Sequence, residues 1–127
     1  MSNVPDNFRY SKDHEWARVD GRRATIGITD HAQAELTDVV YVELPAVGKV
    51  VKAGDVLGTV ESVKAVSEIF APLGGKVVEV NRALDNTPES VNADPYGKGW
   101  MVVLEVGDPA EASRLMDAAT YRKHIGE

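Results

Sequence analysis

The chain has 127 residues, and its composition excludes several kinds of chemistry. A chain of this length is typical of one domain with a sizeable core, so we expect a single domain over residues 1–127. It contains no Cys, which excludes disulfides, thiolate nucleophiles and cysteine-based metal sites. The net charge of −6, from 14 Lys and Arg against 20 Asp and Glu, argues against binding nucleic acid or an anionic membrane. These features suit a protein that meets other proteins.

The sequence shows neither a membrane span nor a targeting segment. Its apolar runs are far shorter than the roughly 18–20 residues that a membrane-spanning helix needs. Residues 1–7 have neither the pattern of a secretory signal nor that of a transit peptide. We expect a cytoplasmic location in a bacterium, although a processed form from the mitochondrial matrix would look the same.

Short β-branched runs separated by Gly, Pro and Asp dominate residues 8–106, which is typical of a small antiparallel β barrel or sandwich. The first hairpin is predicted from residues 16–19 and 24–28. These runs flank Asp20-Gly21, a dipeptide that favours a tight turn because Gly accepts positive φ. The sequence therefore predicts a mainly β core.

A short helix and a strand follow this hairpin. Asp30 with Gln33 three residues later resembles a capping box, which predicts a helix that continues to about Leu36. Residues 39–44 then form a predicted strand. It ends at Pro45, which has no amide hydrogen to donate to a neighbouring strand.

The middle of the chain contains an approximate repeat. The tetrapeptide at residues 48–51 recurs at 75–78, and the tripeptide at 61–63 recurs at 89–91. Such a repeat suits a barrel made of two similar β units. Matches this short also arise by chance in a chain rich in Val and Gly, so the pattern leaves both interpretations open.

Helical signals return in the last third of the chain. Thr87-Pro88 predicts a single helical turn, and residues 100–106 a last strand. Asp108-Pro109 then begins a C-terminal helical segment over about residues 108–125. Asp117 has the character of a cap for a second short helix. Apolar residues at helical spacing predict an amphipathic helix packed on the β core: Ala112, Leu115, Met116 and Ala119.

Lys64 differs from the other six lysines in its surroundings. It lies midway between two β-type stretches, without the Gly, Pro or Asn that normally makes a turn. If the chain reverses there, Lys64 lies at a hairpin tip and projects its long stem into solvent. A covalently attached swinging arm needs this geometry. An exposed turn lysine is usually only a solvated charge, so position alone does not decide its role.

The residues around Lys64 belong to a pattern that extends well beyond the lysine. Its stretches are Glu61-Ser62-Val63-Lys64-Ala65-Val66-Ser67, Ala71-Pro72, Val77-Val78-Glu79-Val80-Asn81, Tyr10, His14-Glu15-Trp16, residues 26–33, residues 38–45, Asn92-Ala93-Asp94-Pro95-Tyr96-Gly97 and Gly99-Trp100-Met101. In their order and spacing these stretches resemble the glycine cleavage H-protein family. The sequence departs from the family pattern at Thr37 and Gly74, where Gly and Ser are usual.

This resemblance implies a fold, a cofactor and a site. The implied fold is a flattened barrel-sandwich hybrid of the lipoyl and biotinyl type, with short helices and a C-terminal amphipathic helix. The implied cofactor is lipoate, attached covalently to Lys64. No catalytic residue is implied, since such a protein is a carrier and not an enzyme. The context of the attachment site is Glu61, Ser62, Val63, Ala65 and Ser67.

The resemblance also implies partners. A glycine decarboxylase (P protein) would load an aminomethyl group onto the arm, an aminomethyltransferase (T protein) would receive it, and a dihydrolipoamide dehydrogenase (L protein) would then take electrons. Separate enzymes would attach the lipoate, because an unactivated lysine is a poor nucleophile at pH 7. The loaded arm would fold into a cleft where Glu15 accepts its ammonium group, with Asp13 and Glu68 as further candidates.

Two alternatives stay open at this point. A lipoyl-relay protein that donates lipoate to 2-oxo acid dehydrogenases would have a similar sequence. A small acid–base hydrolase would use His14, Glu15 and Asp30. We predict no metal site, since the three histidines show no recognisable ligand spacing.

Overall fold

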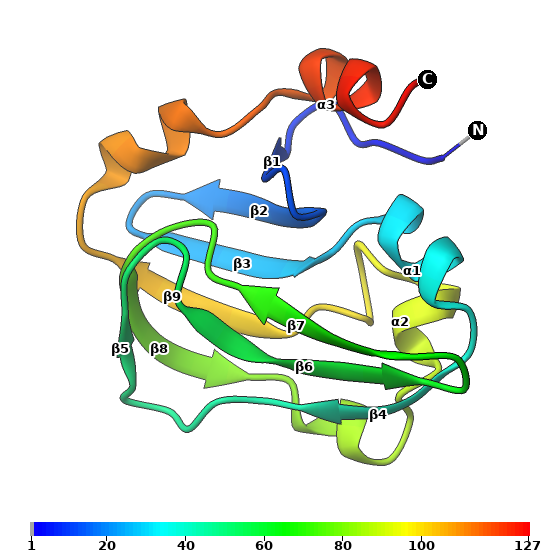
Figure 1. Ribbon diagram of the computed structural model, residues 1–127. Coiled ribbons are helices and arrows are strands. Elements are labelled where there is room, and N and C mark those ends of the chain that lie inside the picture. Colours follow the sequence, from blue (N-terminus) through cyan, green and yellow to red (C-terminus); the bar gives the residue numbers. More distant parts are fainter. Residues whose placement is uncertain (1) are drawn as a thin grey trace.

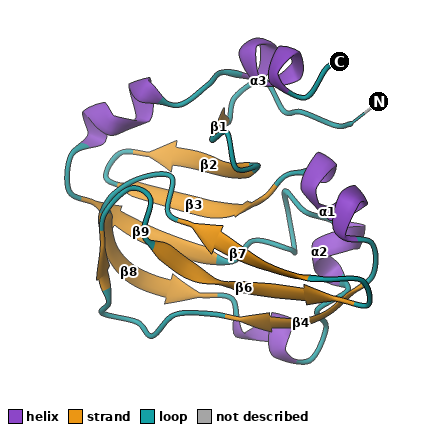
Figure 2. Ribbon diagram, in the orientation of Figure 1, coloured by secondary structure: helices purple, strands orange, loops and turns teal. Residues whose placement is uncertain are grey.

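The computed structural model describes residues 2–127 and consists mainly of two antiparallel β sheets (Figures 1 and 2). The larger sheet has the strand order β1-β2-β3-β9-β8-β5, and the smaller has the order β4-β6-β7. The strands are β1 (Arg9–Tyr10), β2 (Glu15–Asp20), β3 (Arg23–Ile28), β4 (Val39–Glu43), β5 (Val50–Val51), β6 (Val56–Ser62), β7 (Val66–Phe70), β8 (Gly75–Val80) and β9 (Val102–Val106).

The hairpin predicted around Asp20-Gly21 is confirmed. Strands β2 and β3 pair antiparallel from Glu15 opposite Ile28 to Asp20 opposite Arg23. Gly21 has a φ of 61°, the left-handed conformation that favours Gly at such a turn. The last strand, β9, then pairs with β3 on one side and β8 on the other.

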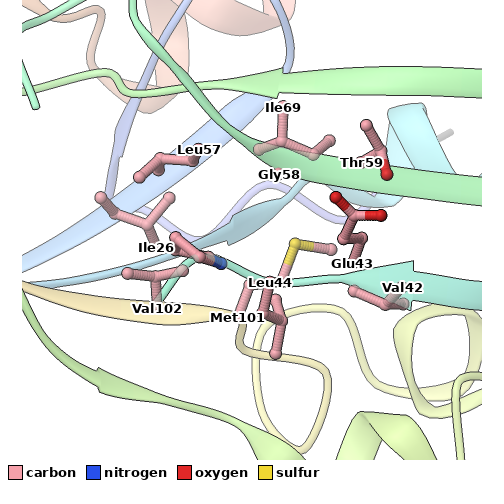
Figure 3. A pocket seen from close by; sticks show the side chains of 11 residues that line it. Ile26, Val42, Glu43, Leu44, Leu57, Gly58, Thr59, Ile69, Met101 and Val102 are labelled. Atoms are coloured by element: carbon pink, nitrogen blue, oxygen red, sulfur yellow. The ribbon is translucent and has the colours of Figure 1, made fainter. Parts of the chain in front are cut away.

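The core lies between the two sheets. Apolar side chains of both inner faces, such as Ile26 and Val102 on the larger sheet and Leu57 and Val60 on the smaller, belong to one buried cluster. Figure 3 shows side chains from both sheets around a small apolar cavity of about 10 Å³. A void of that size holds about one water molecule at most, so it is a packing defect and not a ligand site.

The sequence repeat does not mark two similar β units. Its first pair of segments contains strands that pair with each other, with Val50 opposite Lys76 and Val51 opposite Gly75. Its second pair differs in structure: residues 61–63 end β6 and begin a hairpin loop, whereas residues 89–91 lead into helix α2 (Ser90–Ala93). The short helical turn predicted after Pro88 is present. The two copies of the tripeptide therefore have different backbone conformations.

Helix α1 (Asp30–Leu36) has the predicted extent but a different cap. Thr29, not Asp30, is the N-cap residue, since its hydroxyl accepts a hydrogen bond from the Ala32 amide at 3.2 Å. Asp30 instead accepts a hydrogen bond from the side-chain amide of Gln33 at 2.8 Å. The predicted link between Asp30 and Gln33 is thus real, but it lies inside the first turn of the helix.

The C-terminal segment is helical as predicted, but the amphipathic helix expected through Ala112, Leu115, Met116 and Ala119 is interrupted. The segment forms a 3₁₀ helix, η2 (Pro109–Arg114), and then helix α3 (Ala118–His124), which Asp117 caps as expected. Between them the backbone of Met116 exchanges two hydrogen bonds with that of Tyr10, at 2.8 and 2.9 Å. This pairing holds the chain extended and interrupts the helix. Another 3₁₀ helix, η1 (Arg82–Asp85), was not predicted.

Helix α3 lies against β1, near both chain ends (Figure 1). The helices among residues 2–127 are all too short or too polar to cross a membrane.

Candidate functional site

Lys64 lies at the tip of the β6–β7 hairpin. Glu61 pairs with Val66, and the amide of Ser62 donates to the carbonyl of Ala65 at 2.8 Å, so Val63 and Lys64 form a two-residue loop. Lys64 is exposed. The expected position at a chain reversal is therefore present.

Ser62 supplies the turn signal that this loop otherwise lacks. Its hydroxyl oxygen accepts hydrogen bonds from the amides of Lys64, at 3.2 Å, and Ala65, at 3.0 Å. A further bond, from the Val63 amide to the Asp38 carbonyl at 3.0 Å, ties the loop to the start of β4. Neither loop residue has positive φ, so the turn needs no Gly or Asn.

The side chain of Lys64 is lightly held. Its ammonium group donates to the backbone carbonyl of Glu35, at the end of α1, at 3.3 Å. The apolar side chains of Val63 and Val66 beside it are 70% and 65% exposed. The amine and an apolar surface around it are therefore both accessible from outside the protein.

A cleft of about 290 Å³ lies next to Lys64. Its walls come from three parts of the chain: the segment before β2, helix α1 with the end of β3, and strand β7. Both apolar and acidic side chains line it. The lining residues are Asp13, His14, Ile28, Ala32, Glu35, Leu36, Ala65, Val66, Ser67, Glu68 and Ile69.

Glu15 lines a neighbouring cleft of about 350 Å³, to which Asp13 also contributes. Glu15 is 1% exposed. One carboxylate oxygen accepts from the Ser11 hydroxyl, and the other accepts from the Phe70 amide at 3.3 Å. Burial raises the pKa of Glu15 to about 7, although both hydrogen bonds act in the opposite direction.

The structure brings together some of the predicted cleft residues and adds others. Asp13 and Glu68 line the cleft beside Lys64, whereas Glu15 is reached only from the neighbouring cleft. His14 and Glu35 also form the walls: His14 was predicted only as an acid–base group of the alternative hydrolase, and Glu35 was not predicted at all. Among the residues that the sequence analysis named around Lys64, Ser62 shapes the turn, and Ala65 and Ser67 line the cleft.

The geometry does not support the acid–base hydrolase. The Asp30 carboxylate accepts hydrogen bonds from the Asn3 amide and from Gln33, so it caps local structure. Glu15 is buried, and the pocket that it lines does not include His14 or Asp30. Within residues 2–127, no group of His, Asp and Glu side chains has the geometry of a metal site.

Comparison with protein families gives a match to the family model described as glycine cleavage H-protein, over residues 8–127. Two similar curated proteins are named glycine cleavage system H protein. The one from Anaeromyxobacter sp. (strain K) is 54% identical over 124 residues, which are 98% of this chain and 97% of that protein. The one from Halalkalibacterium halodurans is 54% identical over 127 residues, which cover 100% and 99% of the two chains.

A solved structure supports the same relationship. The crystal structure of a glycine cleavage system H protein from Mycobacterium marinum superposes with a TM-score of 0.86 at 38% identity. The match covers 98% of this chain and 100% of the other.

Proposed function

This chain belongs to the glycine cleavage H-protein family, and from that premise we propose that it carries lipoate on Lys64. The family role is that of the lipoyl carrier in the glycine cleavage system, a carrier component and not an enzyme. The choice of Lys64 as the attachment site rests on its position: it is exposed at the tip of a two-residue hairpin loop.

The surroundings of Lys64 fit a lipoyl group. Attached lipoate would supply a disulfide that accepts an aminomethyl group and two electrons. The aliphatic part of such an arm needs apolar contacts, which Ile28, Leu36 and Ile69 offer in the adjacent cleft. Amide formation would also remove the charge of Lys64, and its bond to the Glu35 carbonyl is a single contact that is easily given up.

The acidic residues of the cleft suit a cationic cargo. We propose that Asp13 and Glu68 face the ammonium group of the aminomethyl cargo at the cleft wall, and that Glu15 accepts it on the side of the neighbouring cleft, since Asp13 lines both. A cation near the buried Glu15 carboxyl would favour its ionised form and so lower its pKa from about 7. Exclusion of water from the cleft would slow hydrolysis of the cargo.

The proposed partners follow from the family role. They are the glycine decarboxylase, the aminomethyltransferase, the dihydrolipoamide dehydrogenase and the enzymes that attach lipoate. A tethered cargo meets each of them at an effective concentration that the arm determines. We propose that the whole chain acts as one domain with these enzymes in the bacterial cytoplasm. The relatives are named for the glycine cleavage system, which favours this role over donation of lipoate to other complexes.

Intact-mass measurement tests the attachment site. Incubation of the protein with lipoate, ATP and a lipoate ligase should add one lipoyl group, and peptide mapping should locate it on Lys64. Lys64→Arg keeps the positive charge but cannot form the amide, so it should stay unmodified and lose glycine cleavage, with unchanged thermal unfolding.

The exposed Lys76 on β8 provides the matched control. Lys76→Arg should be lipoylated and active as the wild type. A wild-type chain that remains unmodified with an active ligase, or a lipoyl group found on another lysine, would overturn the proposal.

A further inference from the structure

Helix α3 is attached to the cleft through the hydroxyl group of Tyr121. The side chain is fully buried, and its hydroxyl lies 2.8 Å from Nδ1 of His14 and 2.7 Å from the hydroxyl of Thr29. His14 belongs to the cleft wall before β2. Thr29 caps helix α1, which contributes the opposite wall through Ala32, Glu35 and Leu36. One buried hydroxyl thus joins two of the three walls.

A second contact from α3 reaches the same segment. Nε2 of His124 lies 3.1 Å from the backbone carbonyl of Lys12, next to Asp13. Since a carbonyl only accepts, the histidine is the donor. The ring of His124 also lies 5.7 Å from that of His14. The cleft segment is therefore held by α3 at two adjacent points.

The wall residue His14 needs this support. It is not a glycine, yet its φ is 70°, a conformation that costs free energy and persists only when surrounding contacts impose it. The pKa of His14 is lowered, first by burial and then by His31 and His124, so the ring is neutral at pH 7. A neutral ring has one nitrogen that donates and one that accepts, which suits a single fixed partner such as Tyr121.

We propose that Tyr121, together with His124, is a positioning residue for the cleft that shelters the arm on Lys64. The inference deepens the proposed function and rests on it for the role of the cleft. Tyr121 does not line that cleft and acts through His14 and the helix cap. Its loss should loosen the segment that carries Asp13, His14 and Glu15, and should leave the turn at Lys64, which Ser62 holds, unchanged.

Tyr10 provides a matched control. Its ring stacks on that of Tyr121 at 4.7 Å, it is equally buried, and its hydroxyl also makes a hydrogen bond, to the Pro5 carbonyl. Tyr121→Phe and Tyr10→Phe thus each remove one hydroxyl from the same aromatic cluster. The first removal affects the cleft wall, and the second does not.

The first test uses the unmodified chain. Amide hydrogen exchange of residues 13–15 should accelerate about three- to tenfold in Tyr121→Phe, the range expected for one lost hydrogen bond, and not in Tyr10→Phe. The ¹⁵N shifts of the His14 ring should change only in Tyr121→Phe. His124→Ala alters an exposed residue and should accelerate the same exchange, which provides a second variant if Tyr121→Phe does not fold.

The second test uses the lipoylated chain, loaded with an aminomethyl group by the decarboxylase and followed by intact mass. The cargo should be lost to water as formaldehyde and ammonium several times faster in Tyr121→Phe than in Tyr10→Phe. Equal exchange rates and equal cargo lifetimes in the two variants would overturn the positioning role. If the wild type cannot be loaded, the proposed function fails instead, while the exchange data still decide whether Tyr121 holds the wall.

Discussion

At the scale of the residue, Ser62 closes the hairpin that presents Lys64 by means of its side chain. Two-residue hairpin loops commonly use Gly or Asn, which adopt positive φ without strain. Here neither Val63 nor Lys64 does so, and the Ser62 hydroxyl accepts the amides of Lys64 and Ala65 instead. Lys64 thus keeps an ordinary backbone conformation at the tip of a well-defined loop.

Ser62→Ala tests this account. The substitution leaves two loop amides without their acceptor, and it should lower the free energy of unfolding by about 1–2 kcal/mol. Lipoate attachment to Lys64 should slow, because the ligase then meets a less ordered tip. Chemical denaturation and a time course of intact mass measure the two effects. Ser67→Ala on the same hairpin is the control, and equal behaviour of both variants would refute the role of the hydroxyl.

At the scale of the element, helix α1 ends in a strained conformation. Its C-cap residue, Thr37, has φ 65° and ψ −149°, a region that is essentially restricted to glycine. The sequence departs from the usual Gly of the family at this same position. A β-branched residue there costs of order 1–3 kcal/mol, which the surrounding structure has to offset. The Thr37 carbonyl, held by Asn92 at 2.7 Å, is one of the contacts that impose the conformation.

Thr37→Gly should therefore stabilise the protein, by about 1 kcal/mol after the loss of the threonine contacts. Thr37→Ala loses the same hydroxyl but keeps a Cβ atom, so it should not stabilise. The midpoint of thermal unfolding for the two variants measures the difference. A gain of equal size in both would show that the side-chain contacts of Thr37, and not its φ, are unfavourable.

The elements with local signals were predictable from the sequence, and those that depend on distant contacts were not. Asp20-Gly21 indicated the first hairpin, and Asp117 indicated the cap of α3. The apolar residues from Ala112 to Ala119 had helical spacing, but pairing between Met116 and Tyr10 overrides it. No local pattern encodes a partner more than a hundred residues away.

The candidate site likewise has parts that were predictable from local sequence and parts that depend on distant contacts. The exposed position of Lys64 at a hairpin tip was predictable because its sequence context is distinctive. The places of Glu35 and His14 in the cleft wall and the contact of Tyr121 with His14 were not, because these residues come from separate parts of the chain and meet only in the fold. Glu15 was predicted as a cleft residue, but its nearly complete burial could not be inferred from a strand position alone.

At the scale of the whole molecule, the absence of Cys makes the proposed arm chemically distinct. A lipoyl group on Lys64 would bring the only sulfur atoms capable of thiol–disulfide exchange, since the chain has none of its own. No thiol of the same chain competes for the arm. A thiol reagent therefore reports on the arm alone.

The buried Glu15 and the half-buried His14 give the stability of the whole molecule opposite dependences on pH. Glu15 has a raised pKa in the folded state, so its stabilisation is complete below its ordinary value of 4.5 and is lost as the pH rises through about 7. His14 has a lowered pKa, so its neutral ring favours the folded state above 6.5, and stability is lost as the pH falls below that value. Below pH 6.5 the changes in stability from Glu15 and from His14 have opposite signs and partly cancel. Above pH 6.5 the change in stability comes mainly from Glu15.

Glu15→Gln isolates the contribution of this carboxyl group. A shift from 4.5 to about 7 makes the folded state about 3 kcal/mol less stable at pH 8 than at pH 4 through this group alone. The free energy of unfolding of Glu15→Gln relative to the wild type should therefore rise by about that amount between these two pH values. Urea denaturation at a series of pH values measures the difference. Glu105→Gln removes an exposed carboxylate and controls for the change in net charge. Parallel pH profiles of Glu15→Gln and the wild type would show that Glu15 titrates alike in the folded and unfolded chains, and would remove the basis for its role as a tunable acceptor in the cleft.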